Sequence, residues 1–248
     1  MPIFAVENLS KSFGGLQAIV NLSFAIEERT ITSLIGPNGA GKTTAFSLIT
    51  GFLKPDTGKV LYRGRDITGL PPFQIVNLGI VRTFQDVRVL NKLTVRENLL
   101  IGLRQTHHQG FLQSTLGGKS LKGKMMAEID RLIEFVGLKE AAEELAENVS
   151  YAEQKLMILA RALATDAQLL LLDEPASGLD QTSIERMMAL LRRLVEEGKT
   201  VLIVEHNMDV VIHISDHVVV LDFGHKIAAG TPGEIRSDPK VIQAYLGV

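Results

Sequence analysis

The most chemically specific segment is a glycine-rich stretch between an apolar run and a helical pattern. Residues 31–35 are apolar apart from Thr32 and Ser33, and GPNGAGKTT follows them at 36–44. This matches the spacing G-x-x-x-x-G-K-[ST], in which glycines let backbone N–H groups turn toward phosphate oxygens at a helix N-terminus. Lys42 then neutralises the β- and γ-phosphates, and the Thr43 hydroxyl is a ligand for Mg²⁺. The segment predicts a nucleotide site made of Gly36, Pro37, Asn38, Gly39, Ala40, Gly41, Lys42, Thr43 and Thr44.

An acidic pair follows a second apolar run. Leu169–Leu172 precede Asp173 and Glu174, and the carboxyl ends of parallel strands are where such sheets bind ligands. Asp173 is then placed to hold the shell of a Mg²⁺ ion, and Glu174 to accept a proton from a water that attacks the γ-phosphate. An acidic pair at this place also serves simply as a helix cap. The phosphate loop favours the catalytic interpretation.

Four short apolar runs must form the strands that position these groups. They lie at 31–35, 169–172, 201–204 and 218–221 and lack alternation, which is typical of strands buried on both faces of a parallel sheet. Helical patterns separate them. One has Thr182 and Glu185 as a capping box and Gly198 as a stop. The alternation predicts an α/β fold.

Residues 94–154 show no strand pattern. Thr94 and Glu97 form a capping box that opens a helix, the basic run at 117–124 predicts a solvated loop, and 125–145 is again helical. We interpret this stretch as a helical insertion in the α/β core. Near the carboxyl end, Thr231 with Glu234 and then Asp238 before Pro239 predict two further capped helices.

Composition excludes several classes of protein. The 248 residues hold 26 Lys+Arg against 28 Asp+Glu, so there is no global basic field for nucleic acid. With 0 Cys there is no thiol chemistry and no disulfide framework. The apolar runs are far shorter than the ~20 residues of a membrane helix, and the first residues do not resemble an export signal.

The chain resembles the ATP-binding cassette (ABC) ATPases. The string 172–180, LDEPASGLD, is similar to the joined Walker B motif and D-loop of that family. Phe13 resembles the aromatic residue that stacks on adenine, Gln85 the Q-loop glutamine that touches Mg²⁺ and the attacking water, and His206 the switch histidine. Each of the three, taken alone, is equally consistent with ordinary packing or a surface position. The order and spacing of the motifs fit the family.

The segment 149–154 stands where the family has its signature motif, but it departs from L-S-G-G-Q. Ser150 is retained, whereas Val149, Tyr151, Ala152 and Glu153 replace the other positions. If the position of Ala152 requires positive φ, the alanine costs about 1 kcal/mol; if φ is negative, that cost vanishes. The segment also fits a plain helix cap through Ser150.

The resemblance implies a fold and an activity. The fold is a P-loop NTPase (RecA-like) core with a mainly parallel sheet, an N-terminal antiparallel β part and an inserted helical subdomain. We expect one ABC ATPase domain over 1–248, with its core at 1–88 and 155–248 and the helical subdomain at about 89–154. The activity is ATP hydrolysis with Mg²⁺. In the family, Ser150, Tyr151, Ala152, Glu153 and Asp180 face the nucleotide of a second ABC subunit, in a homodimer or heterodimer.

The carboxyl-terminal stretch is similar to importer cassettes for branched-chain amino acids, and related urea, amide and lipopolysaccharide-export cassettes share parts of it. This implies a subunit that energises a partner integral membrane permease from the cytoplasmic face of the membrane, indirectly serving a substrate-binding protein. Two other hypotheses stand beside it. A soluble cassette acting on nucleic acid or the ribosome predicts a basic groove, and a small-molecule phosphotransferase shares the phosphate loop but does not explain Gln85 and Ser150.

Overall fold

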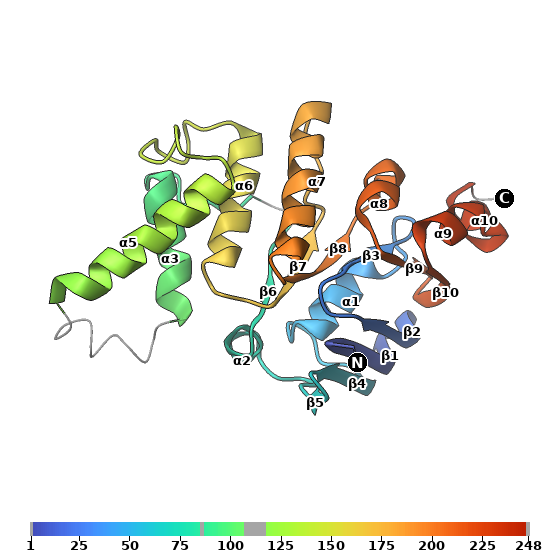
Figure 1. Cartoon of the computed structure of the whole chain (residues 1–248). Coiled ribbons are helices and arrows are strands. Elements are labelled where there is room, and N and C mark those ends of the chain that lie inside the picture. Colours follow the sequence, from blue (N-terminus) through green and yellow to red (C-terminus); the bar gives the residue numbers. More distant parts are fainter. Residues whose placement is uncertain (1, 85–86, 107–117, 247–248) are drawn as a thin grey trace.

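Two sheets form the frame of the computed structural model, which describes residues 2–84, 87–106 and 118–246 (Figure 1). One is four-stranded and antiparallel, in the order β2-β1-β4-β5. The other is six-stranded, in the order β10-β9-β3-β8-β7-β6, and is parallel except for β10. The strands are β1 (Phe4–Phe13), β2 (Leu16–Ile26), β3 (Ile31–Ile35), β4 (Thr57–Tyr62), β5 (Arg65–Asp66), β6 (Ile80–Arg82), β7 (Leu169–Asp173), β8 (Thr200–Val204), β9 (His217–Asp222) and β10 (His225–Gly230).

Helices lie on both faces of the six-stranded sheet, while others stand to one side of it (Figure 1). They are α1 (Lys42–Ile49), α2 (Pro72–Asn77), α3 (Val95–Thr106), α5 (Gly118–Phe135), α6 (Tyr151–Leu163), α7 (Gln181–Glu196), α8 (Met208–Ile214), α9 (Pro232–Ser237) and α10 (Pro239–Leu246). The predicted α/β class, with a mainly parallel sheet and an antiparallel part near the N-terminus, is confirmed.

Strand β7 shows why its sequence is apolar throughout. Leu169 and Leu171 pack into the core that β1, β2 and α1 share. Leu170 and Leu172 point the other way, into the core under α6 and α7. Successive side chains of a strand alternate between the two faces, so a strand covered on both sides needs apolar residues at every position.

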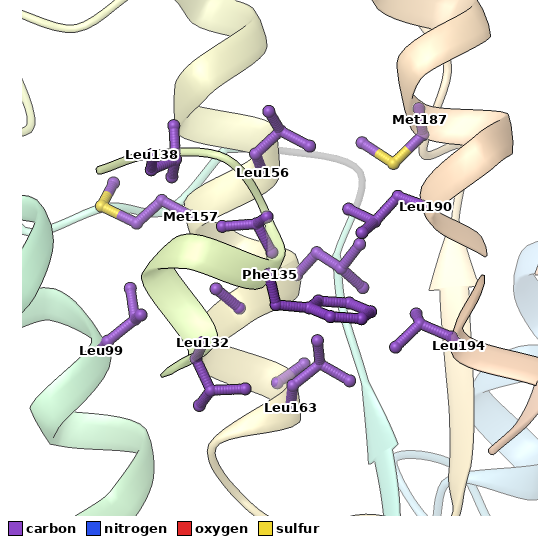
Figure 2. Close-up of a cluster of buried hydrophobic side chains, with 14 of the residues drawn as sticks. Leu99, Leu132, Phe135, Leu138, Leu156, Met157, Leu163, Met187, Leu190 and Leu194 are labelled. Carbon is purple, nitrogen blue, oxygen red and sulfur yellow. The ribbon is translucent and has the colours of Figure 1, made fainter. Parts of the chain in front are cut away.

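Helix α6 joins the group formed by α3 and α5 to the rest of the molecule. Figure 2 shows Leu99 of α3 on one side of α6 and Met187 and Leu190 of α7 on the other, with the ring of Phe135 of α5 pointing toward α7. All of these side chains are buried. The same helix therefore packs against both parts of the core, and its N-terminal turn lies beside the loop that follows β7.

The structure corrects three expectations. The N-cap of α7 is Asp180, which accepts a hydrogen bond from Ser183 N, and not Thr182, which lies in the first turn; both residue types cap helices, and the sequence offers them two positions apart. Residues 118–124, expected as a loop, belong to α5, because lysine and leucine are good helix formers and offset the glycines. Finally, the helix expected over 125–145 ends at Phe135, because Gly137 adopts a left-handed conformation, with φ +70°, that does not continue a helix.

Other predicted helix ends are confirmed. Thr94 and Glu97 form reciprocal hydrogen bonds at the start of α3. Thr231 forms the predicted capping box with Glu234. In the described ranges no helix combines the length and the apolar character that crossing a membrane requires.

Candidate functional site

The site lies where three neighbouring parallel strands end. Strands β3, β8 and β7 are adjacent in the sheet, and Val204 of β8 pairs with Leu34 on one side and Asp173 on the other. Beyond these pairs the chain continues into the phosphate loop, into His206 and into Glu174. The sheet register thus brings three segments that are far apart in the sequence to one edge.

The shape of the phosphate loop requires glycine at two positions. Gly36 has φ +151°, and a Cβ there would lie 2.1 Å from the carbonyl oxygen of Leu221. Gly41 has φ +99°, and its Cβ would lie 2.6 Å from the oxygen of Ala18. Any larger residue would push the loop away from the strands behind it, so the loop keeps its curvature only with glycine.

The N-terminus of α1 opens into this loop without protein groups that would compete with an anion. Its N-cap, Gly41, offers no side-chain hydrogen bond, and the first turn has no acidic residue. Such a helix end attracts negative charge. Thr43 is exposed there and Thr44 is half-buried, while Pro37, Asn38, Gly39 and Ala40 form the rest of the loop.

Lys42 lies folded over the loop. Its Nζ donates to the carbonyl oxygens of Gly36, at 2.7 Å, and Pro37, at 2.9 Å. Burial lowers the pKa of this ammonium, and the carboxylates of Glu174 and Asp173 act in the opposite direction. An ammonium close to the N-terminus of a helix is a donor set that suits phosphate oxygens.

Asp173 is paired with an arginine that the sequence did not single out. Arg82 Nη2 donates to Asp173 Oδ2 at 2.9 Å, and the two side chains are 7% and 8% exposed. The guanidinium lies among the rings of Phe46, Phe52 and Phe84, at 5.4, 5.9 and 5.1 Å from their centroids. Arg82 therefore connects α1, the segment before Gln85 and the end of β7.

Glu174 begins the turn after β7 with φ +49°, a left-handed conformation that is uncommon outside glycine. Its N–H donates to Val204 O at 2.9 Å, and its carbonyl accepts from Lys155 Nζ at 2.7 Å. Its carboxylate Oε1 lies 3.6 Å from His206 Nδ1. Glu174 and His206 are thus brought together at the edge where β7 and β8 end.

The turn that carries Glu174 is tied to the His206 segment by a buried carboxylate. Glu205 is 0% exposed, and its two oxygens accept hydrogen bonds from Ala176 N at 2.9 Å and His206 N at 3.3 Å. Burial raises the pKa of Glu205, although these amides act against the shift. Glu205 fixes the distance between the two loops.

The remaining predicted residues lie around this edge or outside the description. Phe13 is at the end of β1 with its ring 46% exposed and Lys11 Nζ 5.7 Å from its centroid. Gln85 lies outside the described residues. In the described ranges no three His, Asp or Glu side chains gather as a metal site.

The signature segment forms the start of α6. Ser150 is the N-cap and Glu153 completes a capping box, with Ser150 N donating to Glu153 Oε2 at 2.8 Å. The cap interpretation of this segment therefore holds as local structure. Ala152 lies inside the helix and is not among the residues with positive φ, so the strain considered for it is absent. Tyr151 is 46% exposed, and Asp180 is an exposed N-cap of α7.

Sequence reasoning missed Arg82, Lys155 and Glu205. The signal for Lys155 was present, because it shares a helical face with Leu159 and Leu163, both buried. A charged residue on an apolar stripe needs a buried partner. For Arg82 the sequence has no comparable signal, since its partner is on another strand.

Comparisons with known proteins agree with this geometry. A family model described as ABC transporter matches residues 19–177, and one described as Branched-chain amino acid ATP-binding cassette transporter matches 225–248. The high-affinity branched-chain amino acid transport ATP-binding protein LivG of Salmonella typhimurium is 42% identical, over 99% of this chain and 98% of its own length. A probable LivG of Archaeoglobus fulgidus is 40% identical, over 100% and 96%.

Solved structures extend the likeness to the whole fold. A nucleotide-free ATP-binding cassette from an ABC transporter has a TM-score of 0.88, and a cassette in its ADP conformation has 0.89. Both are 35% identical, and each alignment covers 100% of both chains. From the family match and the full-length relatives, the chain belongs to the ATP-hydrolysing cassettes of the ABC transporter family.

Proposed function

We propose that this chain hydrolyses ATP to energise a membrane permease that imports branched-chain amino acids or a related small solute. The observation that carries the activity is the meeting of the phosphate loop, Glu174 and His206 at one edge of the sheet. The choice of solute is supported by the relatives, which are named as branched-chain amino acid transport proteins. The chain aligns with almost the entire length of each.

The residues at the edge then have separate tasks. The backbone N–H groups of 36–44 and the ammonium of Lys42 hold the phosphates of ATP, with Phe13 against the adenine. Glu174 accepts the proton of the attacking water, and His206, 3.6 Å away, orients that water and contacts the γ-phosphate. Phosphoryl transfer depends mainly on such positioning and on neutralising charge.

Thr43, Asp173 and Gln85 are the residues that would hold Mg²⁺. The exposed hydroxyl of Thr43 and the carboxylate of Asp173 are hard oxygen donors, as this ion requires. The ion supplies neutralisation of the charge on the β- and γ-phosphates. One oxygen of Asp173 is already engaged by Arg82, which holds the side chain in place.

A second cassette completes the site in this proposal. Ser150, Tyr151, Ala152, Glu153 and Asp180 of one cassette face the nucleotide bound to the other, so ATP joins the pair and its hydrolysis releases it. The exposed N-caps Ser150 and Asp180 support this assignment, because both lie at helix N-termini. We further propose that the chain divides into a core, 1–88 and 155–248, and a helical subdomain at about 89–154.

The assembly binds at the cytoplasmic face of the membrane through its permease, and a substrate-binding protein supplies the solute. The test is reconstitution of the chain with its co-purified permease in proteoliposomes. We expect ATP-dependent uptake of leucine but not of urea, and phosphate release that rises with leucine-loaded binding protein. Phosphate release without uptake of either solute would contradict the transport assignment, and transfer of phosphate to a metabolite would contradict the hydrolytic one.

A further inference from the structure

The backbone of Glu174 is held in a conformation that it would not adopt alone. Its φ of +49° lies in the left-handed region, which is unfavourable for a non-glycine residue. Such a conformation persists only where the surroundings fix it. The N–H of Glu174 donates to Val204 O at 2.9 Å, and its carbonyl oxygen accepts from Lys155 Nζ at 2.7 Å and from Ser177 N at 3.2 Å.

Lys155 approaches Glu174 from a different element. It lies on α6, one turn after Tyr151, and is 7% exposed. Its Nζ lies 5.6 Å from the centroid of the Tyr151 ring, and that ring packs against Gly178, where a Cβ would be 3.1 Å from Tyr151 Cε1. Little water reaches the ammonium, and a buried cation needs a polar partner. The carbonyl of Glu174 is that partner.

We propose that Lys155 is a positioning residue for the carboxylate of Glu174 and couples the orientation of helix α6 to the activation of water. The inference rests on the proposed function, in which Glu174 is the proton acceptor and the start of α6 faces the nucleotide of a second cassette. One helix then presents Ser150 to that second site and holds the base of its own site. The ammonium acts through the main chain of Glu174 and touches neither ATP nor water.

The first test compares three forms of the full chain: the unchanged protein, Lys155→Met and Lys155→Gln. Both replacements are one atom shorter than lysine along the side chain, but methionine removes the hydrogen-bond donor whereas glutamine keeps one. We expect kcat to fall about tenfold or more with methionine, because small displacements of a catalytic group have effects of this size, and to fall less with glutamine. KM and the Kd for ATP should stay within about twofold, since Lys155 does not contact the nucleotide.

The second test separates positioning from general loosening of the fold. In the Glu174→Gln background the carboxylate is already absent, so Lys155→Met should lower the residual single-turnover rate by less than about twofold. An equal fractional loss in both backgrounds would mean that Lys155 acts on the fold and would overturn the inference. A wild-type kcat in Lys155→Met would overturn it too; if that variant does not fold, a wild-type kcat in Lys155→Gln decides the matter.

The same measurements distinguish this inference from the proposed function. If the unchanged chain releases no phosphate from ATP, the hydrolytic function fails, and the role of Lys155 fails with it. If the unchanged chain hydrolyses ATP and the variants do so equally well, only the role of Lys155 is lost.

Discussion

The Nδ1 atom of His206 lies 3.6 Å from Oε1 of Glu174, although 31 residues (175–205) separate the two in the chain.

 The chain between them forms the turn at 175–180, helix α7 and strand β8, and it returns to the same edge because β7 and β8 are parallel neighbours. Glu174 has an 18% exposed side chain and His206 a 54% exposed one, so the carboxylate is the more enclosed of the two. This pair offers a proton acceptor and a group to orient water side by side.

Glu174→Gln should stop hydrolysis without stopping binding. Glutamine keeps the shape of the side chain but accepts no proton, so kcat should fall about a hundredfold or more. Because the phosphate loop is unchanged, ATP should still bind and hold two cassettes together. Phosphate release and analytical ultracentrifugation with ATP check both points. Hydrolysis near the normal rate would remove Glu174 from its role as the base.

Lys42→Ala should weaken nucleotide binding. The ammonium donates to Gly36 O and Pro37 O and stands within the loop. A hydrogen bond to a charged group contributes about 1.5–3 kcal/mol, so the Kd for ATP should rise about 10- to 150-fold in calorimetry. Lys54→Ala, at an exposed lysine, is the matched control. Equal affinities in the two variants would contradict the phosphate-loop assignment.

Arg82→Met should destabilise the fold. It leaves the Asp173 carboxylate, only 8% exposed, without its guanidinium partner. Removing one member of a buried ion pair costs about 3–5 kcal/mol, and urea unfolding measures this loss. Arg65→Met removes an exposed arginine from β5 and should change stability by less than about 0.5 kcal/mol. Similar unfolding midpoints for the two variants would mean that the Arg82 pair contributes nothing.

The strands and the loop chemistry were predictable because their signals are local. The apolar run at 31–35 and the glycine spacing after it are properties of adjacent residues, and β3 occupies that run. Arg82 and Asp173 meet for another reason: Arg82 pairs in register with Leu171 when β6 adds to the edge of the sheet. No local pattern records that pairing. Local patterns also have a limit: the sequence pattern predicts the N-cap at Thr182, but Asp180, two residues earlier, has a side chain that caps helices equally well and is the N-cap in the structure.

The buried carboxylate of Glu205 should make stability depend on pH. Burial raises its pKa in the folded chain above the ordinary value of 4.5. The folded state therefore disfavours the ionised form. The contribution of Glu205 to the free energy of unfolding is fully present below pH 4.5 and is lost as the pH rises through the raised pKa. Glu205→Gln does not ionise, so this fall should be absent from its urea unfolding curves over the same range. Parallel pH profiles for the two proteins would exclude Glu205 as the cause.

Glu153→Gln should strengthen ATP-driven pairing of cassettes. Glutamine also completes capping boxes, so α6 should keep its start while losing a negative charge beside Ser150. In the proposed dimer that charge faces the phosphates of the second cassette's ATP, and removing a repulsion of about 1 kcal/mol changes an equilibrium about fivefold. Dimerisation of the Glu174→Gln protein with ATP, measured at low and high salt, reports the change, which should shrink as salt screens the charge. Glu140→Gln removes an exposed carboxylate elsewhere and should leave dimerisation unchanged; an equal gain in both variants would place the effect in net charge rather than at the start of α6.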